Sequence, residues 1–337
     1  MTATIEYATR RDRQELLDFL LTVFRRNNAS HPKFEDIYPD LFLADDEVLG
    51  RHAVIRENGR IAACVGTYPL LMQVCGKRIL TAGVGQVATA EAAQGKGYMT
   101  ALLTHELARC REEGAVVAWL GGRRDRYSHF GFDCAGLRFD YVLDARSVRN
   151  IKETMSVTHV AATAPGAITE EMFALRETTV DSVIEPLETY RLQMTRLGFK
   201  FEIWSAGTAA CDAPVAWAVV DANEGANRIE EWCGSFEGRV QIIAALARAN
   251  GRAHRMEIPQ EKELSAFLRE HSTYFSPHSA MLAVLDREKL LKDYGDLLPA
   301  GFTAPSAADP CALVRALFGP GRDSAELPFA IPGIFHV

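Results

Sequence analysis

"VATAEAAQGKGYMTALL", residues 87–103, decides the fold because it joins a strand to a helix through closely spaced glycines. A β-like run ends near Thr89, and an amphipathic helix begins near Gly97. The free N–H groups and positive dipole end of such a helix attract anions. Gly95 and Gly97 let the backbone approach a ligand closely, and Lys96 between them adds a cation. The stretch fits a phosphate-binding loop or an ordinary strand-to-helix connection, and spacing alone favours neither.

Two other phosphate loops are excluded by the same residues. The dinucleotide fingerprint GxGxxG is absent, and the preceding strand belongs to a hairpin meander. A Walker loop is excluded because no Gly-Lys-Ser/Thr ends the stretch.

Around this stretch, hydrophobic periodicity predicts a mixed α/β (α+β) architecture. Glu57-Asn58-Gly59 is a strong hairpin signal between two strands. From about residue 150 a second, similar order of elements follows, and the tail is rich in proline and glycine. The predicted strands are 4–8, 52–74 (two), 79–90, 115–122, 137–144, 155–163, 213–221, 229–235 and 253–259, and the helices are 11–27, 97–113, 125–132, 169–184 and 237–250.

Composition narrows the function classes. The 337 residues are 48% hydrophobic and 24% charged, as in ordinary globular proteins, and the net charge of -7 argues against a nucleic-acid partner. No signal peptide or bilayer-spanning stretch is evident. The seven cysteines form no CxxC pair and no zinc-like cluster. We expect a cytoplasmic protein with reduced thiols, no metal and no membrane partner.

The opening stretch resembles motif A of the GNAT acetyltransferase superfamily, Arg/Gln-x-x-Gly-x-Gly/Ala after a strand. Gln94 and Gly97 match it, whereas Met99 departs from the final Gly/Ala. Downstream, "YSHFGF" (127–132) is similar to the superfamily signature Tyr-x-x-Phe-Gly-Phe/Tyr. The two motifs together cover about residues 1–145 and are more specific than either alone.

The whole chain most resembles the Eis-like branch, in which large residues at the position of Met99 are usual. That resemblance implies a GNAT fold with a mixed central sheet and two GNAT-like domains in tandem. It predicts an acetyl-CoA-binding domain at 1–150, a degenerate GNAT-like domain at 151–275, and a reduced sterol-carrier-like region at 276–337. "SAMLAVLDREKLL" (279–291) resembles the start of that last region. Eis-like proteins form dimers and hexamers, so a homo-oligomer is compatible with it.

The resemblance also implies acetyl-CoA as co-substrate and assigns residues to it. The strand at Val87, Ala88 and Thr89 would pair with the pantetheine arm. Tyr127 would be the general acid toward the sulfur, although a core tyrosine is the structural alternative. The amides predicted to hold the pyrophosphate are those of Gln94, Gly95, Lys96, Gly97, Tyr98, Met99 and Thr100.

The general base is harder to identify. Many superfamily members use a glutamate on the central strand, but this chain has Gln86, which cannot take a proton. In the Eis-like branch the terminal carboxylate reaches the active site, so Val337 is the predicted base. The apolar ending "PFAIPGIFHV" suits a docked tail, and docking for purely structural reasons is the alternative.

Other candidates each have a structural alternative. His105 is a candidate base or a surface or packing residue, and His129 is a candidate base or a side chain that points elsewhere on a helical turn. Arg123 and Arg124 are candidate phosphate ligands or solvated or ion-paired arginines. An acidic loop offers a cationic-amine pocket or a solvated face, through Glu35, Asp36, Asp40, Asp45, Asp46 and Glu47.

The sequence therefore predicts an acetyl-CoA-dependent N-acetyltransferase that transfers directly to an amine of a small molecule or peptide, with Tyr127 as acid. A non-catalytic acetyl-CoA-binding or regulatory protein is the alternative, because Gln86 replaces an acid. A structural or interaction protein with coincidental motifs fits less well.

Overall fold

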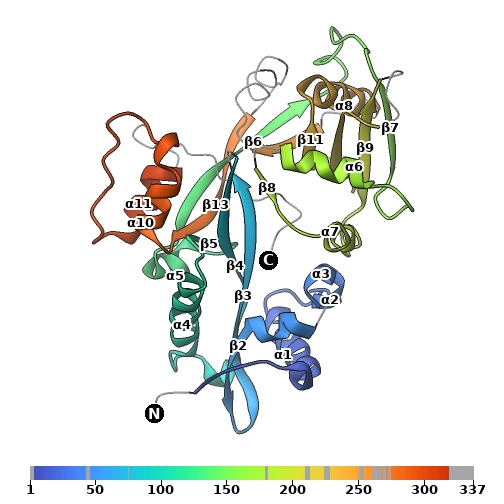
Figure 1. Cartoon of the computed structure of the whole chain (residues 1–337). Helices are drawn as coiled ribbons and strands as arrows, with labels where there is room; N and C mark the ends of the chain where they lie inside the picture. Colours follow the sequence, from blue (N-terminus) through green and yellow to red (C-terminus); the bar gives the residue numbers. More distant parts are fainter. Residues whose placement is uncertain are drawn as a thin grey trace.

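The structure, a computed structural model, describes residues 4–42, 46–74, 76–178, 181–208, 213–223, 228–249, 254–259, 267, 271 and 275–318. It is a mixed α/β protein with a long central sheet and a smaller second sheet (Figure 1). The predicted fold class is confirmed. None of the described helices has the length and apolar character needed to cross a membrane.

The central sheet is mixed. Among the described residues it has nine strands, and β4 and β5 are the parallel pair among antiparallel neighbours. The order is β1 (Ile5–Tyr7), β2 (His52–Glu57), β3 (Arg60–Val74), β4 (Lys77–Thr89), β5 (Val117–Leu120), β13 (Phe275–Val284), β6 (Asp133–Leu143) and β12 (His254–Pro259), with β8 (Asp181–Val183) paired to β3.

The β2–β3 hairpin turns at Asn58 and Gly59, whose φ angles of 51° and 77° are both positive. Two consecutive positive φ angles are typical of the tight hairpin turn that Asn-Gly favours. A second turn with Gly76 at φ 75° joins β3 to β4. The predicted three-strand meander is confirmed, and it forms the centre of the sheet.

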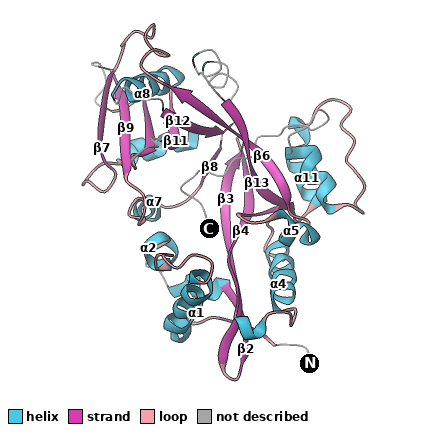
Figure 2. Cartoon of the chain, turned by 180° about the vertical axis from the view of Figure 1, so that it is seen from behind, coloured by secondary structure: helices cyan, strands magenta, loops and turns pink. Residues whose placement is uncertain are grey.

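Helices cover both faces of this meander because its side chains alternate between them. Val54 packs with the leucines of α1 (Arg13–Arg25), whereas its neighbours Ala53 and Ile55 pack with those of α4 (Tyr98–Glu112). Figure 2 shows α1 and α4 on opposite sides of the strands. Two short helices, α2 (Phe34–Ile37) and α3 (Pro39–Phe42), follow α1 on its side of the sheet.

The second sheet is antiparallel and is also covered on both faces. Helix α8 packs against Trp204 and Val220, whereas Trp217 and Val219 face the segments that carry α6 and α7. Its order is β11 (Arg228–Gly234), β10 (Ala216–Asp221), β9 (Phe201–Gly207) and β7 (Ser156–Ala161), with α6 (Glu170–Ala174), α7 (Leu187–Gln193) and α8 (Phe236–Ala249) around it.

The last described segment returns to the central sheet. Strand β13 lies between β5 and β6, and α10 (Arg287–Asp293) and α11 (Pro310–Phe318) follow it. Residues 279–291, identified above with the start of a C-terminal region, therefore contribute a strand to the first sheet. The three domain boundaries stay a prediction.

The helix predicted for residues 169–184 is wrong in its second half. Helix α6 ends at Ala174 and a single 3-10 turn follows it. The chain then forms β8, which pairs with Met72–Val74 of β3. Pairing with β3 across the sheet overrides the helical period here. Helix α7 and strand β9 were not predicted.

Candidate active site

The site lies where the parallel strands β4 and β5 separate. They pair at Thr81–Gly83 with Val117–Trp119. Strand β5 ends at Leu120, whereas β4 continues to Thr89. Within the described part of the chain, β4 beyond Gly83 has no strand partner on the β5 side. A ligand that carries amide groups can pair with this open edge.

Gln86 lies at a β-bulge in this open part of β4. The flanking pairs are Cys64–Ala88 and Gly66–Gly85, so β4 has one residue more than β3 between them. Gln86 has a φ of 48°, which is uncommon for a residue with a side chain. The bulge changes which residues of β4 face the widening gap between the two strands.

The loop between β4 and α4 has the backbone geometry of an anion site. Gly95 and Gly97 both have a φ of 78°, and Gly97 is the N-cap of α4. A Cβ at either position would meet nothing within 4 Å, so glycine is favoured here by the positive φ angle and not by a lack of space. The first-turn N–H groups of α4 have no acceptor inside the helix and are available to an anion.

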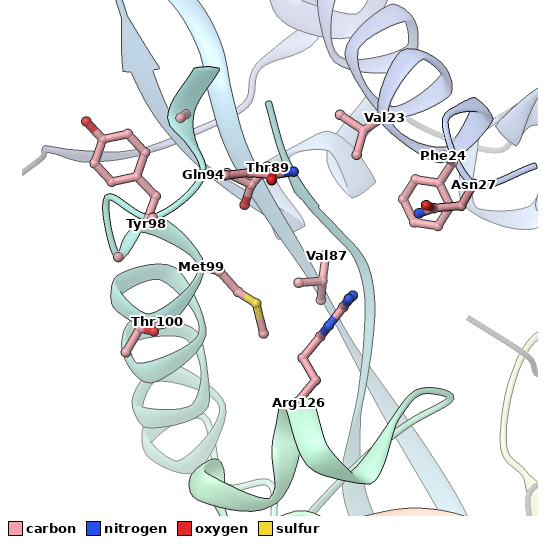
Figure 3. Close-up of a pocket in the computed structure, with 13 residues that line it drawn as sticks. Val23, Phe24, Asn27, Val87, Thr89, Gln94, Tyr98, Met99, Thr100 and Arg126 are labelled. Atoms are coloured by element: carbon pink, nitrogen blue, oxygen red, sulfur yellow. The ribbon is translucent and has the colours of Figure 1, made fainter. Parts of the chain in front are cut away.

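Two side chains of this loop are anchored to the β2–β3 hairpin. Lys96 Nζ donates to Glu57 Oε1 at 2.7 Å, and the Tyr98 hydroxyl donates to the same oxygen at 2.6 Å. Figure 3 shows the Tyr98 ring pointing away from the cavity. Hydrogen bonds from both lower the pKa of the Glu57 carboxyl. The charge of Lys96 is therefore neutralised by the hairpin, and Glu57 holds the loop in place.

A cavity of about 620 Å³ opens beside the loop, between α4 and the end of α1 (Figure 3). Its walls include Val87 and Thr89 on the open edge of β4. Met99 of α4 and Arg126 of α5 (Arg124–Tyr127) point into it. The volume lies within the roughly 300 to 1,000 Å³ of small-molecule sites. The open strand edge can pair with amide groups of a ligand, and the loop amides and the Arg126 guanidinium can bind its phosphates. The site therefore suits a long ligand that carries both kinds of group.

A smaller cavity of about 240 Å³ continues from the first and shares Phe24, Val87 and Arg126 with it. Gln86 and Tyr127 line it. Tyr127 is 6% exposed, and burial raises the pKa of its hydroxyl although the Arg126 guanidinium opposes this. The hydroxyl is therefore protonated at neutral pH and can donate a proton.

The structure brings most of the predicted site residues together. Ala88 packs on the other face of β4 against α1, and Lys96 is bound to Glu57. Val337, the predicted base, lies outside the described residues. The predicted coenzyme residues that line the large cavity are Val87, Thr89, Gln94, Gly95, Gly97, Tyr98, Met99 and Thr100.

Three arginines precede Tyr127 closely in the sequence. Arg123 and Arg124 are ion-paired, whereas Arg126 faces the large cavity. Arg123 pairs with Asp125 at 2.7 Å, and Arg124 with Asp133 at 2.5 Å, as the ion-pair alternative predicts. Arg126 faces the cavity and was not predicted. Helix α5 has only four residues, which is too short for hydrophobic periodicity to orient this side chain.

Neither candidate histidine is among the described residues that line the two cavities. His105 contacts the Tyr7 hydroxyl at 3.0 Å, and the His129 ring lies 4.0 Å from that of Phe130. These contacts fit a surface or packing role for His105 and a His129 side chain that points elsewhere.

The acidic loop contributes no described residue to either cavity. Asp40 is ion-paired with Arg196 at 3.3 Å, and Asp45 lies outside the described residues. Aromatic residues of the same segment, Phe34 and Tyr38, line the small cavity instead.

Comparison with known protein families finds a match in the first part of the chain. Residues 4–135 match the family model of the acetyltransferase (GNAT) domain. No curated protein sequence matches the chain.

Solved structures resemble most of the chain. A GCN5-related N-acetyltransferase from Anabaena variabilis ATCC 29413 has a TM-score of 0.67 at 18% identity, covering 86% of this chain and 74% of its own. A GCN5-related N-acetyltransferase from Kribbella flavida has a TM-score of 0.65 at 17% identity, and the match covers 84% of this chain and 72% of that one. Eis1 from Mycobacterium abscessus has a TM-score of 0.63 at 18% identity, and the match covers 87% of this chain and 76% of that one. These likenesses concern the fold alone, whereas the match to the acetyltransferase (GNAT) domain model covers residues 4–135.

Proposed function

We propose that the protein is an acetyl-CoA-dependent N-acetyltransferase. The observation that carries this proposal is a continuous pair of cavities. They extend from the N-terminus of α4, along the open edge of β4, to the buried hydroxyl of Tyr127. An anion site, an amide-pairing edge and a proton donor therefore follow one another in the order of the parts of acetyl-CoA.

The chain's own groups fit this co-substrate. The amides from Gln94 to Thr100 would hold the pyrophosphate, and the left-handed glycines Gly95 and Gly97 let them converge. Arg126, pointing into the same cavity, adds the cation that Lys96 does not supply. The edge of β4 at Val87–Thr89 would pair with the pantetheine amides.

Besides binding the co-substrate, the reaction requires a proton for the departing sulfur. When bound, acetyl-CoA supplies an acetyl group activated as a thioester. Tyr127 holds its proton at neutral pH because burial raises its pKa, and it would deliver that proton from Oη to the departing sulfur. The terminal carboxylate of Val337 is the proposed base that removes the proton from the amine.

A non-catalytic coenzyme-binding protein is the second candidate, and one observation favours it. Gln86 occupies the bulge where an acid would serve as base, and no Asp or Glu is among the described residues that line the small cavity. Such a protein would bind acetyl-CoA without turnover.

Two measurements separate these candidates. Release of free thiol from acetyl-CoA in the presence of a panel of amines tests turnover. Tyr127→Phe should lower kcat by about 100-fold because it removes one proton donor, while calorimetry finds acetyl-CoA affinity unchanged. Binding without thiol release for any amine would favour the non-catalytic candidate. An unaltered kcat in Tyr127→Phe would contradict the role of this hydroxyl.

A further inference from the structure

Aromatic rings form one wall of the small cavity. Phe24, His31, Phe34 and Tyr38 come from the end of α1 and the α2 segment. The His31 and Phe34 rings stack with centroids 5.0 Å apart, and Phe24 meets Phe34 edge-on at 5.1 Å. Phe34 also stacks with Tyr38 at 6.2 Å. The partly exposed rings of Phe24, His31 and Tyr38, backed by the buried Phe34, offer a flat apolar molecule the offset and edge contacts that aromatic rings prefer.

Charges in the same cavity are positive. The charged side chains among its described lining residues are Arg123 and Arg126, and no carboxylate accompanies them there. Arg123 is ion-paired with Asp125, which leaves Arg126 as the cation nearest the junction of the two cavities. A second positive charge on an acceptor would meet this guanidinium with no acid among the described lining residues to offset it. The same field favours the free-base form that an attacking amine needs.

Gln86 brings a neutral polar group to the cavity, and buried partners fix its position. The Tyr68 hydroxyl donates to Gln86 Oε1 and lies 2.9 Å from His52 Nε2. Tyr68, His52 and Gln86 are each less than 5% exposed. A Cβ at Gly66 would lie 2.6 Å from the Tyr68 hydroxyl and 2.9 Å from Gln86 Oε1, so the space around this group is filled.

From these three observations we propose that the acceptor is a small primary amine on a flat aromatic body, and that polycationic amines are discriminated against. Gln86 determines this preference, because a carboxylate at the same place would attract cations. The inference rests on the proposed function and specifies its acceptor. The cavity of about 240 Å³ is below the range of roughly 300 to 1,000 Å³ for drug-sized ligands, which limits the acceptor to a small molecule.

Initial rates of thiol release at saturating acetyl-CoA test the preference. We expect kcat/KM for 2-phenylethylamine to exceed that for spermidine by at least about tenfold, from ring packing and charge repulsion together. Kanamycin should be poorer still. Equal or better turnover of spermidine or kanamycin would overturn the acceptor proposal while leaving N-acetyltransferase activity established.

A binding measurement separates failure of the acceptor proposal from failure of the proposed function. Calorimetry uses the full chain saturated with coenzyme A and titrates 2-phenylethylamine or spermidine. Selective binding of the aromatic amine without thiol release would contradict the proposed function, whereas the proposed preference of the small cavity for aromatic amines would still hold. Equal binding of both amines, or tighter binding of spermidine, would overturn the acceptor proposal. Absence of binding by the aromatic amine would overturn it as well.

Matched variants test the role of Gln86. Gln86→Glu keeps size and shape and adds one negative charge, so the preference for 2-phenylethylamine over spermidine should fall several-fold. Gln14→Glu, which adds the same charge on the exposed face of α1, should not change it. If Gln86→Glu does not fold, Arg126→Gln should shift the preference in the same direction by removing the opposing cation. An unchanged ratio in either folded variant would contradict the charge argument.

Discussion

Arg196, on the segment after α7, and Asp40 of α3 form an ion pair in which the side chains are 4% and 8% exposed. Their Nη2 and Oδ1 atoms lie 3.3 Å apart. Gln193 also donates to Asp40, and the main-chain N–H of Leu197 donates to Asp36 O at 2.7 Å. The segment beside the second sheet therefore supports the helices that carry the aromatic wall of the small cavity.

Arg196→Met should test this support. It leaves Asp40 buried without its cation, which typically costs about 3 to 5 kcal/mol. We expect a lower free energy of unfolding and a raised KM for the amine, with KM for acetyl-CoA unchanged. Glu188→Gln is the control, because it breaks an exposed ion pair on the preceding helix α7. An Arg196→Met variant with an unaltered amine KM would refute the coupling.

Gly97→Ala should weaken acetyl-CoA binding several-fold. A Cβ at this position meets no atom within 4 Å, so the cost of about 1 kcal/mol or more comes from the left-handed φ of 78°. The strain would move the first amides of α4. Gly301→Ala is a matched control, with a φ of 83°, equally open space and a position outside both cavities. Calorimetry should find lower affinity in the first variant alone; equal affinities would argue against the anion site.

His52 should make stability depend on pH in the acid range. Burial lowers the pKa of its imidazole from 6.5 to about 4. Between these values the unfolded chain binds the extra proton, so stability rises with pH and this contribution is complete above about 6.5. The difference corresponds to about 3 kcal/mol. Urea unfolding between pH 4.5 and 7 should show a flatter dependence for His52→Gln; parallel curves for variant and wild type would contradict the assignment.

Helix α11 should hold the segment that follows Tyr127. Asp133 is 3% exposed and accepts from Arg315 of α11 at 2.6 Å as well as from Arg124. The Cys311 thiol lies 3.6 Å from the Ser128 carbonyl oxygen. We expect Arg315→Gln to lower kcat a few-fold and to leave acetyl-CoA affinity unchanged. Glu288→Gln on the exposed face of α10 is the control, and an equal kcat in both variants would exclude this positioning role.

The proposed base, the terminal carboxylate of Val337, can be tested by altering the end of the chain. Removing the last few residues should abolish thiol release while the free energy of unfolding and acetyl-CoA binding persist. Extending the chain by several glycines after Val337 should do the same, because it moves the carboxylate and keeps every side chain. A fully active truncation would rule the terminal carboxylate out as the base.

Local signals in the sequence were enough for the centre of the fold. Asn58-Gly59 specifies a tight hairpin turn, and Gly95 with Gly97 marks the loop before α4, because each depends on the φ angles of a few consecutive residues. These features also located the large cavity. They act within a few positions along the chain, which is why one sequence suffices to read them.

Contacts between distant segments could not be read in the same way. The strand β13 enters the central sheet from residues 275–284, and its pairing with β5 joins two segments that lie far apart in the sequence. The aromatic wall depends on the α2 segment and the end of β5 lining the same cavity, and the position of Arg126 depends on a four-residue helix. None of these placements follows from periodicity, because tertiary packing alone selects them.

A crystal structure of the chain with acetyl-CoA would decide where the co-substrate binds. We expect pyrophosphate oxygens within hydrogen-bond distance of the amides between Gln94 and Thr100. We also expect the pantetheine along the open edge of β4 and the thioester sulfur at the Tyr127 hydroxyl. Acetyl-CoA bound elsewhere, or a sulfur beyond the reach of that hydroxyl, would contradict this expectation.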